Sequence, residues 1–218
     1  MNVLPSVEES YGVEVMRKAI HLSSLAIPIV YFFLEKPVAL AILIPLTLAF
    51  GLSDILRLYH APTGRLYERY LGFLLRNHER NDHGRRLNGA TYVLLSATLC
   101  VILFPKVIVV TAFAILIVSD SAAALVGRRF GRHRFFGKSL EGSAAFFATA
   151  ALVVLVSPKI SYVPLEYAIG VAAALLGAVV EASPIPIDDN LTIPLSIGLT
   201  MWAGYAALLP GVNVFALG

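Results

Sequence analysis

The sequence predicts an all-α membrane protein, a polytopic bundle with about seven transmembrane helices. Hydrophobic residues make up 58% of the 218 positions and charged residues only 14%, and the mean hydropathy is +0.79. A soluble domain needs a more polar surface than this, and a disordered chain needs more charge. A disulfide scaffold is excluded because Cys100 is the only cysteine. We therefore expect one membrane-embedded domain over residues 1–218.

Seven apolar segments approach the roughly 20 helical residues that cross a hydrocarbon core of about 30 Å. The first follows an acidic, polar stretch and lacks a small-residue cleavage site, so we expect it to remain as a span and not to be a signal peptide. Pro28, Pro45 and Pro194 lie inside spans and predict kinks. The expected spans are at about 19–35, 38–56, 88–105, 107–127, 142–158, 163–181 and 191–210.

The longest connection between spans, roughly residues 57–87, contains a further helical pattern. Between Thr63 and Leu75, leucines and tyrosines recur at helical spacing among arginines. This pattern predicts an amphipathic helix in the membrane interface, with its basic face toward anionic lipid.

Basic residues are divided unequally between the two sides that seven spans define. Fourteen of the 17 lysines and arginines fall on the side of the N-terminus, and only Lys36, Lys106 and Lys159 fall on the other. The positive-inside rule therefore places the N-terminus in the cytoplasm. Topology accounts for the net charge of +3, so we expect no nucleic-acid partner. Twelve of the 14 carboxylates and all five histidines share the cytoplasmic side, and we expect any chemistry there.

Four polar residues share one face of the helix that enters the first span. Glu14, Arg17, Lys18 and His21 are separated by offsets of three, four and seven residues, which place them on one stripe. Arg17 and Lys18 could simply anchor the span, and His21 could be a satisfied core histidine. The alternative is a site that presents both signs of charge and an imidazole.

Asp54 and Asp120 are carboxylates that lie within predicted spans, where a charge is expensive and indicates function by default. Asp54 precedes Arg57 by one helical turn, and we interpret this arrangement as an ion pair at a helix end. Asp120 follows a 13-residue uncharged run and precedes small residues up to Gly127, which let a helix or a ligand approach closely. Asp120 must therefore meet a cation, a polar partner or water.

The segment from Gly127 to Gly142 is the best candidate for an anion site. Its glycines, arginines and lysine can surround phosphate oxygens with backbone N–H groups and side-chain cations. A P-loop is excluded because five residues separate Gly131 from Gly137 and a predicted membrane helix precedes them. The candidate phosphate-binding residues of this segment are Gly127, Arg128, Gly137, Lys138, Ser139 and Glu141.

An acidic loop without basic residues lies on the same side. Glu181, Asp188 and Asp189 would repel one another unless a cation stood between them, and carboxylate oxygens suit Mg²⁺. Asn190 can cap the last helix, whose positive end faces this loop, and it is a further candidate phosphate-binding residue. Pairing of these acids with the nearby basic loops is the simpler alternative. The candidate metal ligands are Asp120, Glu141, Glu181, Asp188 and Asp189.

These motifs, in this order, resemble the family of dolichol kinases, phytol kinases and CTP-dependent diacylglycerol kinases. The resemblance covers about residues 14–210, without the additional N-terminal spans of eukaryotic dolichol kinases. The matching motifs are Glu14-x-x-Arg17-Lys18-x-x-His21, Asn88-Gly89-Ala90-Thr91, Asp120-x-x-Ala123-x-x-x-Gly127, the loop from Gly137 to Gly142, and Glu181 followed by the segment from Asp188 to Pro194.

The resemblance implies transfer of a γ-phosphate, usually from CTP and with Mg²⁺, to the hydroxyl of a polyprenol, a phytol- or farnesol-type prenol, or diacylglycerol. A consistent mechanism has Asp120 ligate the metal or accept the hydroxyl proton, with His21 as the second choice of base. The cations that would neutralise the triphosphate are Arg17, Lys18, Arg128 and Lys138. Asp188, Asp189 and Glu141 would hold Mg²⁺.

Two other functions remain open from the sequence. A CTP-dependent cytidylyltransferase acting on a phospholipid precursor would use the same nucleotide and metal. A lipid or small-molecule transporter would need charges that continue across the bilayer, and the outer halves of the spans lack titratable groups except Glu166. The expected location is a multi-pass membrane protein, in the plasma membrane if the host is prokaryotic. The choice of lipid and the formation of a homo-oligomer are left open.

Overall fold

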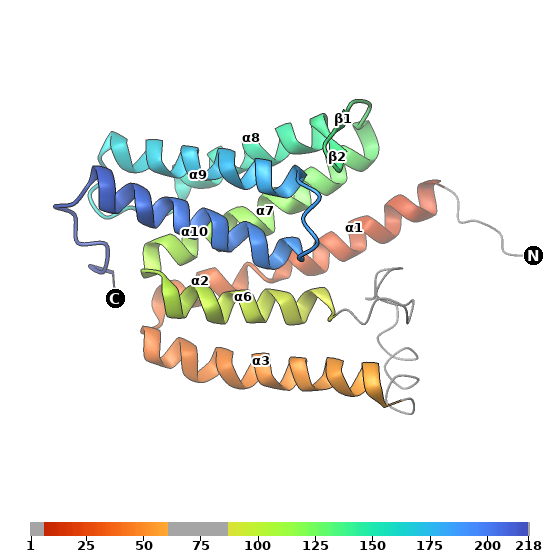
Figure 1. Cartoon of the computed structure of the whole chain (residues 1–218), viewed down its shortest axis with the longest axis horizontal. Helices are drawn as coiled ribbons and strands as arrows, with labels where there is room; N and C mark the ends of the chain where they lie inside the picture. Colours follow the sequence, from red (N-terminus) through yellow and green to blue (C-terminus); the bar gives the residue numbers. More distant parts are fainter. Residues whose placement is uncertain (1–6, 61–86, 218) are drawn as a thin grey trace, which may run out of the picture.

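The structure, a computed structural model, describes residues 7–60 and 87–217 and consists of helices with one short β-hairpin (Figure 1). The predicted all-α membrane fold is confirmed. The predicted amphipathic helix at 63–75 lies outside the described residues. The helices are α1 (Val7–Ser23), α2 (Ala26–Phe33), α3 (Lys36–Tyr59), α6 (Gly89–Leu103), α7 (Lys106–Phe130), α8 (Leu140–Val156), α9 (Pro164–Ala182) and α10 (Asp189–Leu208), and the hairpin pairs β1 (Arg134–Phe135) with β2 (Lys138–Ser139).

The seven predicted spans all correspond to helices. Five stretches within the described residues are long and apolar enough to cross a membrane, namely 14–33, 36–59, 106–130, 164–182 and 189–208. The remaining two, α6 and α8, are apolar but shorter, with 15 and 17 residues. Runs of this length suffice where helix ends are covered by neighbours or by polar residues at the interface.

The first span is interrupted where the sequence places Pro28. A proline at this position cannot donate to the carbonyl of Ser24, and its ring crowds that carbonyl. The chain instead makes tighter backbone hydrogen bonds between residues three apart. Ser24 N–H donates to His21 O at 2.9 Å, and Ile27 N–H donates to Ser24 O at 2.9 Å. The helix therefore divides into α1 and α2. Pro45 and Pro194 lie inside helices that continue on both sides.

Helix α7 is the centre of the bundle and packs against α1, α2, α6, α8 and α10. In its most apolar stretch, 78% of the residues are buried. In the corresponding stretch of α3, which packs mainly on α6, only 17% are buried. The core includes Phe113 of α7, Phe146 of α8 and Ile197 of α10, all of which are inaccessible to solvent. Since α7 is enclosed on most sides, a charged side chain on it must face a neighbouring helix or a cavity.

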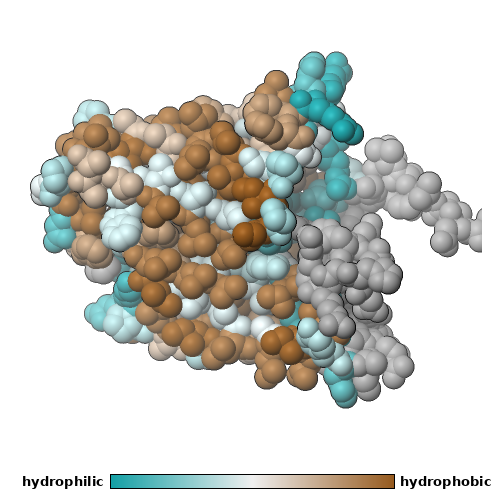
Figure 2. Space-filling view, viewed as in Figure 1, coloured by the Kyte–Doolittle hydropathy of each residue, from teal (hydrophilic) through white to brown (hydrophobic). Residues whose placement is uncertain are grey.

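The outer surface of the bundle is mostly apolar. Figure 2 shows hydrophobic side chains along the helices and hydrophilic ones gathered toward the two ends. Exposed Leu48, Val156 and Leu199 belong to this surface. A continuous apolar surface around the helices is the arrangement that a lipid environment requires.

Three helices begin at one end of the bundle, each with a capped first turn. Asn88 accepts a hydrogen bond from Thr91 N–H at the start of α6, and Ser139 accepts one from Gly142 N–H at the start of α8. At the start of α10 the cap is Asp188 and not the predicted Asn190, because the Asp188 side chain accepts a hydrogen bond from Asn190 N–H. Side-chain caps fix where a helix begins. The polar loops that the sequence marks as candidate sites therefore meet at this end, together with the hairpin (Figure 1).

Candidate functional site

Asp120 lies at the contact between α7 and α1. Its Oδ2 accepts a hydrogen bond from Lys18 Nζ at 2.5 Å and lies 3.7 Å from His21 Nε2. Asp120 is 8% exposed and Lys18 is 5% exposed, so this pair is largely removed from solvent. The carboxylate thus meets a cation, as its position in a span requires. The shared stripe on α1 turns out to face α7.

A second ion pair joins the same two helices. Glu14 Oε2 lies 3.1 Å from Arg128 Nη2, and Glu14 Oε1 accepts a hydrogen bond from Arg17 Nη2 at 3.2 Å. The polarity is reversed between the two pairs, because α1 supplies the anion in this one and the cation in the Lys18–Asp120 pair. Asp120 and Arg128 are eight residues apart, so the two pairs are about two helical turns apart on α7.

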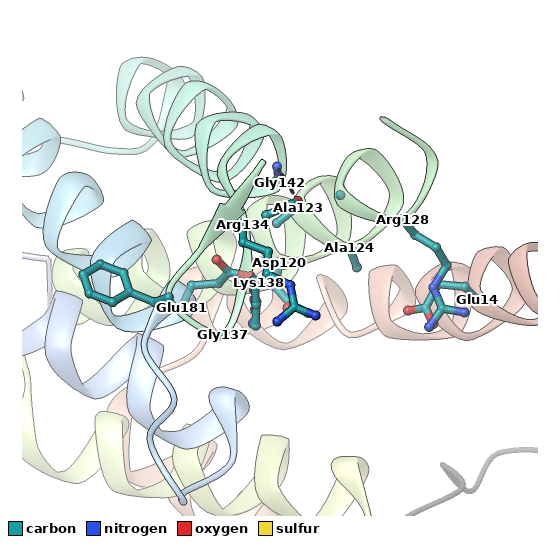
Figure 3. A pocket seen from close by; sticks show the side chains of 13 residues that line it. Glu14, Asp120, Ala123, Ala124, Arg128, Arg134, Gly137, Lys138, Gly142 and Glu181 are labelled. Atoms are coloured by element: carbon teal, nitrogen blue, oxygen red, sulfur yellow. Dashed lines mark hydrogen bonds and ion pairs between the residues drawn. The ribbon is translucent and has the colours of Figure 1, made fainter. Parts of the chain in front are cut away.

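A cavity of about 550 Å³ opens beside these ion pairs. In Figure 3, Glu14 and Arg128 lie at one side of it, and Asp120, Lys138, Arg134 and Glu181 gather at the other. Small residues line it between the two groups, so no side chain fills the space. The lining residues are Glu14, Asp120, Ala123, Ala124, Gly127, Arg128, Arg134, Phe136, Gly137, Lys138, Ser139, Gly142 and Glu181.

The β-hairpin brings Arg134 and Lys138 to this cavity. Its strands pair Arg134 with Ser139 and Phe135 with Lys138, and the tight turn places Phe136 at φ 47°, a backbone conformation unusual for a residue other than glycine. Gly137 N–H donates to Ala182 O at 3.1 Å, which fastens the turn to the end of α9. The hairpin is therefore held against the acidic loop.

Lys138 connects the hairpin to two helices. Its Nζ donates to Glu181 Oε1 of α9 at 2.7 Å and to Asp189 Oδ2 of α10 at 2.8 Å. Burial alone would lower the pKa of Lys138, but the Asp189 and Glu181 carboxylates outweigh it and raise the pKa above its ordinary value. Lys138 therefore keeps its positive charge at neutral pH.

Carboxylate oxygens from α9 and α10 thus converge on a single cationic atom, and carboxylates are donors of the kind that Mg²⁺ accepts. Mg²⁺ is commonly held by one or two carboxylates, with waters and phosphate oxygens completing its shell. Glu181 and Asp189 supply two carboxylates of this kind. Within residues 7–60 and 87–217 the structure contains no group of three or more His, Cys, Asp or Glu side chains arranged around a common point for a metal.

The other predicted phosphate and metal ligands have local partners. Glu141 Oε1 lies 2.7 Å from His133 Nδ1. Both carboxylate oxygens of Glu141 also accept a hydrogen bond from the His133 backbone N–H. Asp188 Oδ1 accepts hydrogen bonds from the backbone and side-chain N–H groups of Asn190, at 3.0 and 2.8 Å. Neither Glu141 nor Asn190 lines the cavity, and their predicted roles stay predictions.

Gly127 and Gly142 allow α7 and α8 to meet closely beside the cavity. A Cβ on Gly142 would lie 3.0 Å from both the Ala123 carbonyl oxygen and Ser139 Oγ. A Cβ on Gly127 would lie 2.9 Å from Ser139 Oγ. These glycines therefore serve helix packing, which is one of the two uses predicted for the small residues after Asp120.

Replacing Gly142 with alanine is expected to destabilise the protein by about 1–3 kcal/mol. The added methyl group would push α8 away from the α7 backbone and disturb the Ser139 cap. Thermal unfolding in detergent should show a lower melting temperature. Gly51→Ala in α3 is the matched control, because its Cβ would meet nothing within 4 Å. An equal melting temperature for both variants would contradict the close-packing role.

Asp54 belongs to a separate buried network. Its predicted ion pair with Arg57 is confirmed, with Arg57 Nε donating to Asp54 Oδ1 at 3.2 Å. The carboxylate also accepts hydrogen bonds from Asn88 N–H at 2.7 Å, Asn88 Nδ2 at 3.0 Å and Thr91 Oγ1 at 2.7 Å. Asp54 thus fastens α3 to the start of α6. Sequence reasoning missed this role because the partners are 34 and 37 residues away.

Sequence reasoning also missed two charged residues of the cavity. Glu14 was placed on the stripe but given no role, and Arg134 was one of several arginines in a basic loop. The signal for Glu14 was its helical spacing from Arg17 and Lys18. Arg134 had no signal of its own, since only the strand pairing turns it toward the cavity.

Comparison with known proteins identifies the relatives of this chain. An uncharacterized protein of Rickettsia prowazekii is 33% identical over 88% of this chain and 95% of its own length. The CTP-dependent diacylglycerol kinase 1 of Saccharomyces cerevisiae is 29% identical over 86% of this chain and 72% of its own length. The phytol kinase of a Synechocystis species is 36% identical over 39% of each chain.

Neither a protein-family model nor a solved structure matches this chain. The curated relatives nevertheless include kinases of two different lipid alcohols, and the membrane-length helices agree with a lipid substrate. The resemblance drawn from the sequence motifs is therefore confirmed by independent similarity. This chain belongs to the family of membrane lipid-alcohol kinases that contains phytol kinase and the CTP-dependent diacylglycerol kinases.

Proposed function

We propose that this protein transfers the γ-phosphate of CTP to the hydroxyl group of a membrane lipid alcohol at the cytoplasmic face. The observation that carries the proposal is the Asp120 carboxylate in the second half of a membrane-length helix, on the wall of a cavity that also presents Arg128, Arg134 and Lys138. An apolar alcohol would arrive from the bilayer, and a nucleotide would arrive from water. The 14 to 3 division of basic residues supports the cytoplasmic side.

The cations of the cavity would bind the triphosphate. Arg128 and Arg134 present planar guanidinium groups that can each hold two phosphate oxygens, whereas Lys138 acts as a point charge. Phosphoryl transfer depends chiefly on positioning and on neutralisation of the developing charge. Bound Mg²⁺, for which Glu181 and Asp189 are the proposed ligands, would contribute further charge neutralisation on the phosphates.

Asp120 would accept the proton of the lipid hydroxyl. Lys18 Nζ and His21 Nε2 both lie near Oδ2, so the carboxylate is held in one orientation. His21 is the second candidate for the base, because its ring shares the same space.

The direct test is a search for the phosphorylated product. Purified protein in detergent with Mg²⁺ would be incubated with each γ-labelled nucleoside triphosphate and a panel of prenols and diacylglycerol. The expected result is label in one lipid alcohol, most efficiently from CTP, with release of CDP. Release of pyrophosphate with incorporation of the cytidylyl group would show a cytidylyltransferase instead. Absence of labelled lipid with every nucleotide and alcohol would contradict the proposal.

Replacing Lys138 with alanine is expected to raise the KM for the nucleotide by about tenfold, the usual scale for a charge-assisted contact. Its ammonium group would no longer neutralise phosphate oxygens, and Glu181 and Asp189 would lose their shared partner. Initial rates at varied nucleotide concentration measure this change. Arg132→Ala removes an exposed cation of the same loop that does not line the cavity, and should leave the KM nearly unchanged. Equal values for both variants would exclude Lys138 from the phosphate site.

A further inference from the structure

Glu14 places a negative charge where the proposed polyanion must bind. It lines the cavity, its side chain is only 4% exposed, and it contacts the two guanidinium groups of Arg17 and Arg128. A carboxylate at this position would repel a phosphate chain by direct Coulomb interaction. Binding of substrate therefore does not explain its presence.

The charged side chains that line the cavity include equal numbers of both signs. The three carboxylates that line it, Glu14, Asp120 and Glu181, are matched by the three cations Arg128, Arg134 and Lys138. Glu14 holds Arg128, and Glu181 holds Lys138. A cation without a counterion is costly where it is partly desolvated, and these carboxylates offset that cost.

We propose that Glu14 is a built-in competitor for the phosphate chain, whose carboxylate occupies the guanidinium groups until phosphate oxygens replace it. The inference rests on the proposed function, since it assumes that Arg17 and Arg128 bind phosphate. Exchange of one anion for another keeps the arginines paired in both states. It also lowers the affinity for every phosphate ligand, product included, so that a nucleoside diphosphate leaves more readily.

The exchange also affects how α1 is attached to α7. Glu14–Arg128 and Lys18–Asp120 are both ion pairs between α1 and α7. When phosphate takes Arg128, the first pair opens, while Lys18 remains on Asp120. Nucleotide binding would then loosen α1 at Glu14 only, two helical turns along α7 from the proposed base.

The test measures binding of inorganic tripolyphosphate to the full chain in detergent by titration calorimetry. Glu14→Gln keeps the size and one acceptor oxygen but removes the charge. The expected result is a dissociation constant about tenfold lower than that of the wild type, because one close repulsion is removed. Glu14→Met, of similar volume, should also lower the dissociation constant. This second variant keeps the test decisive if the glutamine variant fails to fold.

Two comparisons make the result specific. Glu35→Gln removes the same charge from an exposed position at the other end of the bundle, beside the start of α3, and should leave the dissociation constant unchanged. In an Arg128→Gln background, Glu14→Gln should improve binding far less, because the two groups no longer compete. A dissociation constant that is equal or higher in both Glu14 variants would overturn the proposal and make Glu14 a residue that only positions the arginines.

The binding measurement is independent of lipid phosphorylation. Wild-type protein that binds tripolyphosphate but phosphorylates no lipid alcohol would contradict the proposed function and leave the role of Glu14 intact. Lack of tripolyphosphate binding by the wild type and by both Glu14 variants would overturn the inference about Glu14. Normal kinase activity with unchanged binding in Glu14→Gln would overturn only the competitor role.

Discussion

Asp120→Asn is expected to reduce lipid phosphorylation by at least about 100-fold, the lower range for loss of a general base. Asparagine occupies the same space but cannot take the proton of the lipid hydroxyl, and it no longer neutralises Lys18. The loss should appear in kcat more than in the KM for the nucleotide, since Arg128, Arg134 and Lys138 remain. Labelled-lipid formation at saturating CTP measures it.

Ser121→Ala is the matched control for this substitution. Ser121 is buried on the same helix, and its hydroxyl group donates to the Ile117 carbonyl of its own helix at 2.7 Å. Its removal should leave activity within about twofold of the wild type, because a bond within one helix contributes little to the site. Comparable melting temperatures for both variants show that the bundle persists. Wild-type turnover by Asp120→Asn would remove Asp120 from the reaction.

Glu166→Ala is expected to lower the free energy of unfolding by about 3 kcal/mol or more, the scale for breaking a buried charged network. Glu166 is fully buried at the end opposite the cavity. It accepts hydrogen bonds from Ile160 N–H at 3.0 Å, Ser161 N–H at 3.0 Å and Tyr205 Oη–H at 2.9 Å. Alanine would leave all three donors without this acceptor and would loosen the α8–α9 turn.

Lys159 adds to this expected loss. It is 4% exposed and donates to the carbonyl oxygens of Val154 and Ser157. Burial lowers the pKa of Lys159, and the nearby Glu166 carboxylate opposes that change. Without Glu166, Lys159 keeps its carbonyl partners but loses the neighbouring negative charge. Glu166 and Lys159 both make several hydrogen bonds to neighbouring groups, which agrees with a structural role.

Thermal unfolding in detergent measures the effect of Glu166→Ala. Glu35→Ala removes an exposed carboxylate from the same end of the bundle and should leave the melting temperature nearly unchanged. At a temperature where the variant is still folded, its KM for the nucleotide should equal that of the wild type, because the cavity lies at the other end. A melting temperature equal to that of Glu35→Ala would contradict the stabilising role.

The spans could be predicted from the sequence because lipid imposes a simple condition. A helix that crosses a hydrocarbon core must be apolar over most of its length, so α7 and α9 contain the long uncharged stretches 107–119 and 167–180. Pro28 was expected to distort the first span because it removes a helical hydrogen bond, and the helix is interrupted there. Pro45 and Pro194 lie in helices that continue, so the sequence did not show which proline would divide a helix.

The candidate site could be predicted only as a set of residues. Asp120 stood out because a carboxylate in a span needs a partner, yet nothing in the sequence identified Lys18, 102 residues away, as that partner. The acidic loop was expected to bind metal or to pair with a basic loop, and in the structure Lys138 is already shared by Glu181 and Asp189. The choice between such pairings depends on the angles and depths at which helices meet.

The sequence by itself determined that the chain is a helical membrane protein, which residues could carry charge into it, and which family it resembles, because these follow from composition, periodicity and short motifs. Only the tertiary structure decided that Glu14 opposes Arg128, that Arg134 reaches the cavity, and that Glu166 secures the far end. The physical reason is that ion pairs act over a few ångströms, whereas the partners are separated by tens of residues and meet only after the helices pack.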